Sequence, residues 1–313
     1  MIHTLTLNPA LDLEFSLPEI RFNQVLRASR VRSDCGGMGF NIARALAEMG
    51  ETCLAWGLVG GKTGERLAQD LARLGVQTRF VWTAGETRTN VAIVTSPLKE
   101  YIKVNQAGPE VAPGELAKIL DEIGSVAGAG DIWVLSGSLP PGAPVDTYAR
   151  VIDIVQKAGG RALVDADGET LRHACLARPF LVKPNALEAG ELTGMPIHTP
   201  QEAAHACRRF HEWGVEAALI TLAEQGAVLA TDAGLWWARP PEMPIQSPIG
   251  AGDASLAGFV WGLSQGLDDA QCLRLCVASG TASASLPGTA VASRALIEET
   301  AKGVQVTPVR ASS

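Results

Sequence analysis

The chain has 313 residues, of which 47% are hydrophobic and 19% are charged, so it can bury a large core and is not disordered in composition. Its 33 acidic and 26 basic residues give a net charge of −7 without any basic run, which argues against a nucleic acid or an anionic membrane as partner. The length predicts one large domain, or one domain with a smaller appendage, and we expect this domain over residues 1–302.

The start of the chain and the character of its longest uncharged segment predict a soluble, cytoplasmic protein. Residues 2–7 have the pattern of a strand, without the basic and apolar regions of a leader peptide. The uncharged segment from Cys276 to Ser293 is rich in small residues and contains Pro287, which indicates a packed core helix and not a membrane span. The six cysteines include no Cys-x-x-Cys and no zinc-ligand spacing with histidine, which argues against a metal–thiolate site.

Strand and helix patterns alternate along most of the chain. Apolar runs predict strands near Thr52–Val59, Asp131–Ser136, Arg161–Asp165, Phe180–Val182 and Ala217–Thr221. Helical periodicity fills much of the space between them, including Asn41–Met49, Gly64–Leu74, Ala143–Lys157 and Pro200–Trp213. This alternation predicts an α/β fold with a mostly parallel sheet covered by helices.

Two early regions and the C-terminal tail depart from that alternation. The early regions hold short β-like runs without a helix between them, at Leu11–Leu17 with Val25–Ser33 and at Thr87–Thr95 with Tyr101–Val104. They predict a small sheet, from about 11–33 and 87–105, that projects as a lid and keeps water out of a site. Residues 303–313 have little to pack against, so we expect a flexible tail there.

The segment Gly250–Asp253 carries the clearest chemical signal. Two glycines allow a sharp turn, after which the amides of Ala251, Gly252 and Asp253 point from a helix N-terminus toward one anion. An aspartate repels phosphate at this place unless it has another task, such as deprotonating an attacking hydroxyl. The segment therefore predicts phosphoryl transfer, and the alternative is an N-capped helix start without catalysis.

Two other glycine-rich segments fail as nucleotide motifs. Gly60–Thr63 resembles the end of a P-loop, but Trp56 occupies the position of the required first glycine. Gly37–Asn41 resembles a dinucleotide fingerprint, but Ile42 occupies the third glycine position. The segment still allows close backbone approach to a ligand, and Asn41 either binds that ligand or caps the helix.

Three further segments fit the same chemistry. Asn185 and Glu188 follow an apolar strand one helical turn apart, as a hydrated Mg²⁺ on nucleotide phosphates requires, or as a capping box requires. Ser136–Gly142 follows another strand at the sheet edge where ligands bind in α/β folds. Arg88 lies in the lid region, where it either grips a substrate phosphate or is a solvated surface side chain.

Together these segments resemble the ribokinase-like carbohydrate kinases of the phosphofructokinase B group, in the branch of 1-phosphofructokinase and tagatose-6-phosphate kinase. The resemblance spans nearly the whole chain, through Leu7–Asp12, Gly36–Ala43, Thr87–Arg88, Ser136–Gly142, Asp165–Gly168, Lys183–Glu188 and Gly250–Asp253. It implies a ribokinase-like three-layer α/β/α fold and a β-sheet lid that often joins a homodimer. It also implies that ATP, with Mg²⁺, phosphorylates a hydroxyl of a sugar phosphate.

The resemblance also implies a role for each matching residue. Asp253 would be the catalytic base, with a pKa that we expect the helix terminus to keep low, and the amides of Gly250, Ala251 and Gly252 would hold the developing charge. The positions that match sugar-hydroxyl ligands are Asp12, Gly37, Gly39 and Asn41. Arg88 matches the ligand of the substrate's phosphate, with Arg27 and Ser138 as further candidates. The nucleotide positions are Lys183, Asn185, Thr221, Ala223 and Gly226, and the magnesium pair is Asn185 and Glu188.

Some positions depart from the family's pattern. Met38 stands where many relatives carry lysine, Ala223 where glycine is common, and Gln106 where a glutamate is typical. The substrate therefore stays open among fructose 1-phosphate, fructose 6-phosphate and tagatose 6-phosphate. The alternatives are a kinase of an unphosphorylated sugar or nucleoside, and a sugar-phosphate or nucleotide sensor without catalysis on the same fold.

Overall fold

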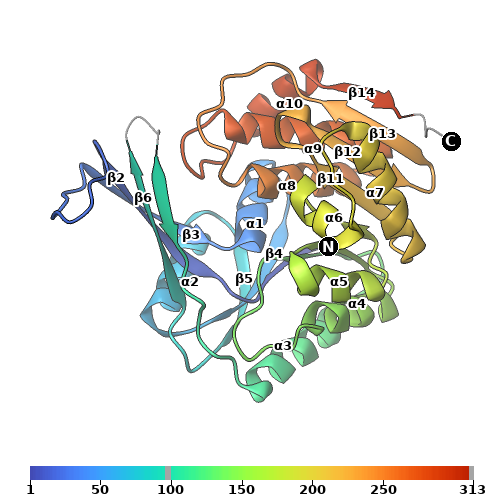
Figure 1. Cartoon of the computed structure of the whole chain (residues 1–313). Coiled ribbons are helices and arrows are strands. Elements are labelled where there is room, and N and C mark those ends of the chain that lie inside the picture. The colour runs from blue at the N-terminus through green and yellow to red at the C-terminus, as the bar shows by residue number, and fades with distance from the viewer. Residues whose placement is uncertain (96–99, 310–313) are drawn as a thin grey trace.

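A large twisted sheet runs through the main body of the protein in the computed structural model, which describes residues 1–95 and 100–309 (Figure 1). Within these residues the sheet has ten strands, in the order β14 (Gln305–Pro308), β13 (Gly234–Arg239), β12 (Ala227–Thr231), β11 (Ala217–Thr221), β10 (Leu181–Val182), β9 (Arg161–Asp165), β8 (Ile132–Ser136), β1 (Ile2–Thr6), β4 (Cys53–Val59) and β5 (Gln77–Trp82). The pairs from β11 to β5 are parallel, and β12, β13 and β14 add an antiparallel edge.

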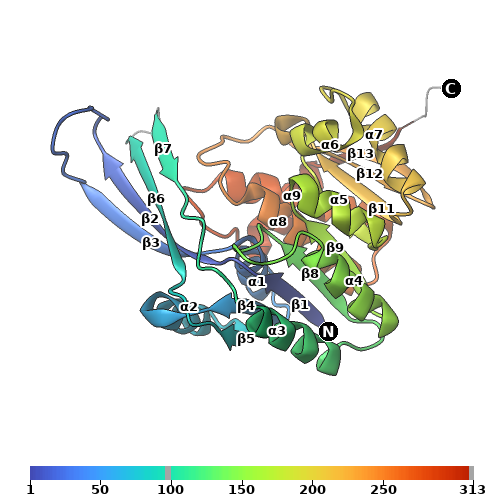
Figure 2. The same ribbon diagram turned by 60° about the horizontal axis from the view of Figure 1, so that its bottom comes forward.

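Helices cover both faces of this sheet, which confirms the predicted three-layer α/β/α architecture (Figures 1 and 2). One face carries α1 (Met38–Glu48), α2 (Gly61–Arg73), α8 (Ala251–Ser264), α9 (Asp269–Ala284) and α10 (Arg294–Gly303). The other face carries α3 (Pro113–Val126), α4 (Thr147–Lys157), α5 (Gly168–Leu176), α6 (Ala186–Thr193) and α7 (Pro200–Glu212). Each face has its own buried apolar cluster, because a sheet of parallel strands is hydrophobic on both sides.

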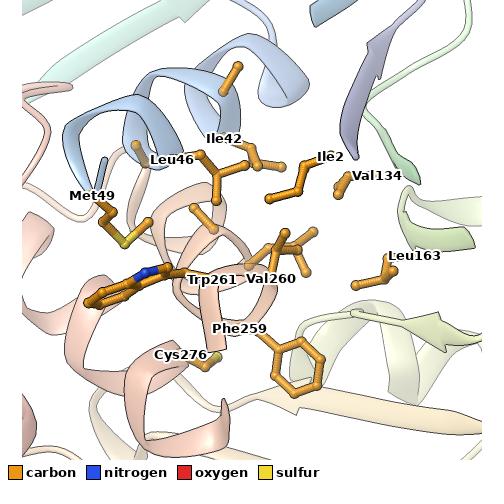
Figure 3. Close-up of a cluster of buried hydrophobic side chains, with 14 of the residues drawn as sticks. Ile2, Ile42, Leu46, Met49, Val134, Leu163, Phe259, Val260, Trp261 and Cys276 are labelled. Carbon is orange, nitrogen blue, oxygen red and sulfur yellow. The ribbon is translucent and has the colours of Figure 1, made fainter. Parts of the chain in front are cut away.

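Helix α8 is held deep in the body by its apolar side chains. Phe259, Val260 and Trp261 are buried among side chains of α1 and of the sheet, as Figure 3 shows. Full burial of each such side chain stabilises the fold by about 1.5–3 kcal/mol. Gly258 lets α9 approach closely, since a Cβ there would overlap the Ser279 side chain. This packing fixes the N-terminus of α8 at the carboxyl edge of the sheet.

A separate four-stranded sheet projects from the body among the described residues (Figures 1 and 2). Its order is β3 (Arg30–Gly36), β2 (Ala10–Leu17), β6 (Arg88–Thr95) and β7 (Tyr101–Val104). We call it the small sheet. The two predicted regions do form it, but β3 begins at Arg30 and not at Val25, and positions 96–99 of the second region lie outside the described residues.

The expectation of a flexible tail over 303–313 is wrong for Gln305–Pro308, which form β14. This strand pairs with β13, where Val306 lies opposite Ala238 and packs against the core. The backbone partners come from a strand about 70 residues earlier, so the tail's own sequence does not reveal them. The main body therefore extends past residue 302, and positions 310–313 lie outside the described residues.

Within the part of the chain that the structure describes, no helix combines the length and apolar character needed to cross a bilayer. The uncharged segment from Cys276 to Ser293 instead forms the end of α9 and the loop before α10. Its buried small residues pack between α8 and the sheet, as expected for a core helix.

Candidate active site

The turn before α8 presents two free backbone amides. Gly250 is the N-cap residue and has φ of 78°, a left-handed conformation that favours glycine. The Ala251 amide donates to the Pro248 carbonyl at 3.2 Å and is therefore already used by the turn. Among the described residues the structure gives no acceptor for the amides of Gly252 and Asp253. Two of the three predicted amides thus remain for an anion, at the positive end of the helix dipole.

Asp253 lies in the first turn of α8 and is only 8% exposed. The Asn41 amide donates to its Oδ2 at 2.8 Å, which joins α1 to α8. Burial and the nearby Asp165 carboxylate raise the pKa of Asp253 to about 7, although Asn41 and Lys183 act in the opposite direction. The expected low pKa is therefore wrong, because desolvation outweighs the helix terminus.

A buried ion pair lies beneath this turn. The Lys183 ammonium contacts the Asp165 carboxylate at 2.9 Å, and both side chains are almost fully buried. Burial alone would lower the pKa of Lys183, but Asp165, Asp253 and Glu188 together raise it, so the ammonium stays charged. We did not predict a site role for Asp165. The available signal was its position at the end of a buried strand, directly at the carboxyl edge of the sheet.

A cavity of about 980 Å³ opens beside the turn, between α8, α9 and the loop after β11. Its lining includes Ala251, Gly252 and Ser255 on one side, which places the free amide of Gly252 at its wall, whereas Asp253 is not among the lining residues. Four of the predicted nucleotide residues also line it, namely Asn185, Thr221, Ala223 and Gly226. Lys183 does not line it and lies behind Gly252, where an added Cβ would be 3.8 Å from the ammonium.

The loop between β11 and β12 contains the short 3-10 helix η1 (Ala223–Gln225) and is strained at one position. Ala223 has φ of 50°, a left-handed conformation that costs an L residue about 1–2 kcal/mol. Gly226 has φ of 88°, and a Cβ there would overlap the Ala238 carbonyl oxygen. The conformation at Ala223 explains why glycine would suit that position better.

Asn185 and Glu188 form a capping box at the start of α6. The Asn185 Oδ1 accepts from the Glu188 amide at 3.0 Å, and the Glu188 Oε2 accepts from the Asn185 amide at 2.9 Å. The second Glu188 oxygen has no hydrogen bond within the described residues, and no group of three His, Cys, Asp or Glu side chains there could enclose a metal. This donor set fits a hydrated Mg²⁺ that phosphates hold in part, and it does not fit an all-protein metal cage.

The predicted sugar-binding residues lie where the small sheet meets the body. Asn90 donates to the Asp12 Oδ1 at 2.8 Å, and burial raises the pKa of Asp12 against the effect of this bond. Gly37 has φ of 130° and is the N-cap of α1. Gly39 lets α1 pack on β1, since a Cβ there would contact Thr6 at 2.5 Å. Asn41 lies inside α1 and does not cap it, because this helix begins at Met38.

The three candidate ligands of the substrate's phosphate, Arg88, Arg27 and Ser138, do not all lie at one place. Arg88 is half-buried and donates to the Asn8 carbonyl at 2.8 Å and to the Gln106 carbonyl at 2.8 Å. Ser138 Oγ accepts from the Asn8 amide at 3.4 Å, near the same junction. Arg27 is exposed in the loop that joins β2 to β3, at the far tip of the small sheet (Figure 1), and has no ion pair among the described residues. The structure therefore does not bring Arg27 to this cluster within one chain.

The segment Gly60–Thr63, which lacks the first glycine of a P-loop, has a carboxylate of the chain itself bound at the helix N-terminus. The Glu86 carboxylate accepts from the Thr63 amide at 2.6 Å and from the Lys62 amide at 3.3 Å, at the start of α2. A hydrogen bond with the Thr63 side chain and the bonds from these two amides lower the pKa of Glu86. A carboxylate of the chain thus occupies the place that a phosphate takes in a P-loop.

Comparison with known proteins agrees with this geometry. Residues 9–295 match the pfkB family carbohydrate kinases. The chain belongs to this family. It is therefore a phosphotransferase with an alcohol group as acceptor, built on the ribokinase-like fold.

Several named phosphofructokinases are similar to this carbohydrate kinase over most of its length. The 1-phosphofructokinase of Bacillus subtilis is 34% identical over 284 residues, which are 91% of this chain and 92% of that protein. The ATP-dependent 6-phosphofructokinase isozyme 2 of Mycobacterium tuberculosis is 34% identical over 298 residues, or 95% of this chain and 88% of that protein. A crystal structure of phosphofructokinase-2 from Escherichia coli in complex with fructose-6-phosphate has a TM-score of 0.89 and 29% identity, and the match covers 96% of this chain and 98% of that chain.

Proposed function

We propose that this kinase transfers the γ-phosphoryl group of ATP to a hydroxyl of a phosphorylated ketohexose, with Asp253 as the base. The observation that carries the proposal is the position of Asp253. It bonds to Asn41, and the neighbouring Gly252 lines the 980 Å³ cavity. The names of the relatives, 1-phosphofructokinase and 6-phosphofructokinase, support a sugar phosphate as acceptor.

In this mechanism Asp253 accepts the proton of the attacking hydroxyl. A pKa near 7 suits this task, because the base is then partly ionised and still basic enough at neutral pH. Asn41 orients the carboxylate, and the free amides of Gly252 and Asp253 stabilise charge that develops on the transferred group. A loose transition state needs this positioning and neutralisation more than it needs a strong base.

The cavity between α8, α9 and the loop after β11 is the proposed ATP site. The glycine-containing turn at Gly252 would meet the phosphates, and the Thr221–Gly226 loop would bound the rest of the nucleotide. Glu188 and Asn185 would hold Mg²⁺ through the free Glu188 oxygen and through water. When bound, Mg²⁺ neutralises charge on the nucleotide phosphates.

Arg88 is the proposed ligand of the substrate's own phosphate. Of the five N–H groups of a guanidinium, three donate here to the Asn8 and Gln106 carbonyls, which leaves two for the phosphate. The carbonyls also fix the plane of the guanidinium, which favours a directed contact. Asp12 and Asn90 on neighbouring strands would accept and donate to sugar hydroxyls beside it.

A homodimer through the small sheet is part of this proposal. The strand register puts one apolar face on this sheet, formed by Leu13, Phe15, Val31, Val91, Ile93, Ile102 and Val104. Val31 and Val104 are 57% and 59% exposed in the single chain, so a second copy would bury them. The Phe15→Glu variant should then be monomeric by light scattering, whereas an unchanged mass would contradict this interface.

A cytoplasmic location is supported by six buried cysteines without disulfides.

A coupled ADP-release assay with Mg²⁺ and ATP tests the proposed reaction. It compares fructose 1-phosphate, fructose 6-phosphate, tagatose 6-phosphate, fructose and ribose, with Asp253→Asn run alongside. We expect turnover on one phosphorylated ketohexose and a loss of several orders of magnitude in the variant. Turnover on fructose or ribose alone would contradict the proposal that Arg88 binds the substrate's phosphate. Near-normal turnover of the Asp253→Asn variant would contradict the proposal that Asp253 is the base.

A further inference from the structure

Arg32 of β3 joins the small sheet to a loop of the body that lies 255 residues later in the chain. Its Nη2 donates to the Thr289 hydroxyl at 3.0 Å, and its Nη1 donates to the Pro287 carbonyl at 3.4 Å. Pro287 and Thr289 belong to the loop between α9 and α10. A single guanidinium therefore spans the junction between the small sheet and the body.

Asp34 closes this contact into a ring of three side chains. The Arg32 Nε contacts the Asp34 Oδ2 at 2.6 Å, and the Thr289 hydroxyl donates to the same oxygen at 3.1 Å. The Arg32 and Asp34 side chains are only 24% and 22% exposed. Because each member has both other members as partners, the ring fixes its geometry better than an isolated surface ion pair does.

The loop is shaped for this contact. Gly288 has φ of 61°, and a Cβ there would overlap the Arg32 guanidinium. The following residues Thr289–Val291 line a small cavity together with Asn41 and Gly250. The ring therefore connects the small sheet to the loop that borders the turn before α8.

The same ring brings a second carboxylate, with its cation, beside Asp12. The register of β2 and β3 places Asp12 directly opposite Asp34, where two carboxylates repel each other. The charge of Asp34 also raises the pKa of Asp12, after burial as the larger cause. Arg32 pairs with Asp34 and so offsets part of the charge that lies opposite Asp12.

We infer that Arg32, Asp34 and Thr289 form a latch that holds β3 against the body and sets the affinity for the sugar phosphate by positioning Asp12. This inference rests on the proposed function. Arg32 and Thr289 are positioning residues: they act through β3 and β2, and the structure gives them no contact with Asp253. The latch contributes to the bound position of the sugar and leaves the nucleotide cavity unchanged.

Kinetics of Arg32→Gln and Thr289→Val, singly and combined, test this role. Each single variant should raise KM for the sugar phosphate about tenfold, while kcat and KM for ATP stay within about twofold. The combined variant should be little worse than either, since both changes open one ring. Arg30→Gln is the matched control, because Arg30 is exposed on the same strand and face and has no ion pair in the described residues.

Hydrogen exchange of the same proteins without substrate tests the latch independently of the reaction. In Arg32→Gln, the amides of β3 and of the loop around Thr289 should exchange at least severalfold faster than in Arg30→Gln. Unchanged exchange would overturn the latch, even if no sugar phosphate is turned over. Faster exchange with an unchanged KM for the substrate, or equal effects of Arg30→Gln and Arg32→Gln, would overturn its role in substrate affinity.

Discussion

The side-chain amide of Asn41 donates to the Asp253 carboxylate at 2.8 Å, across 212 positions of the sequence. One residue follows the glycine segment at the start of α1, and the other follows the glycine turn at the start of α8. Both helix starts lie at the carboxyl edge of the sheet, so two separate glycine-rich segments build one site. The bond also lowers the pKa of a carboxyl that burial raises.

Replacement of Asn41 should move the pH dependence of the reaction. The carboxylate form of Asp253 is the base, so kcat/KM of the native enzyme should rise with pH through about 7 and then level off. Asn41→Leu removes a donor to the carboxylate, so the pKa of Asp253 should rise. The rise of kcat/KM with pH should then shift to higher pH by about one unit. A pH–rate profile of both proteins measures the shift, and coincident limbs would exclude Asp253 as the titrating base.

Replacement of Asp253 should stabilise the protein at neutral and higher pH. Its pKa is raised from 3.8 to about 7 in the folded state, so between these values the folded chain binds more protons than the unfolded chain. Stability from this group therefore falls as pH rises through that window. Asp253→Asn removes the effect and should gain on the order of 2–4 kcal/mol at pH 8, with almost no gain at pH 4. Denaturant unfolding at the two pH values measures this, and a gain independent of pH would contradict it.

Ala223→Gly should stabilise the protein by about 1 kcal/mol, because glycine adopts φ of 50° without the strain that alanine has there. Gly226→Ala, three positions later in the same loop, is the opposite control. Its Cβ would overlap the Ala238 carbonyl oxygen, so it should destabilise the protein by more than about 2 kcal/mol. Thermal unfolding of the two variants compares them, and a lower midpoint for Ala223→Gly would show that the loop does not store this strain.

The body of the fold could be predicted from the sequence because its central strands are short apolar runs whose partners are equally apolar. The edge strands were missed for a physical reason. Gln305–Pro308 is exposed except at Val306 and contains a proline, so it is a strand only because β13 supplies its hydrogen bonds. β12 and β13 were also missed, although Ala227–Thr231 is itself a buried apolar run, and these two strands pair with each other and β12 pairs with β11.

The site residues were predictable as local motifs, whereas their electrostatics were not. The turn at Gly250 and the capping-box spacing of Asn185 and Glu188 are visible in a few residues of sequence. The raised pKa of Asp253 depends on burial and on Asp165, which lies 88 positions earlier. The start of α1 at Met38 was also missed, because Met38 follows glycines that normally disfavour a helix.

Lys183 should be needed for stability because it is the partner of a buried carboxylate. Lys183→Met leaves Asp165 buried and without its cation, which should cost about 3–5 kcal/mol of folding free energy. The combined variant Lys183→Met with Asp165→Asn removes both charges and should recover most of that loss, since a neutral amide is cheaper to bury than a carboxylate. Urea unfolding at pH 8 measures both. Equal instability of the two variants would mean that Lys183 stabilises the body by its packing and not through Asp165.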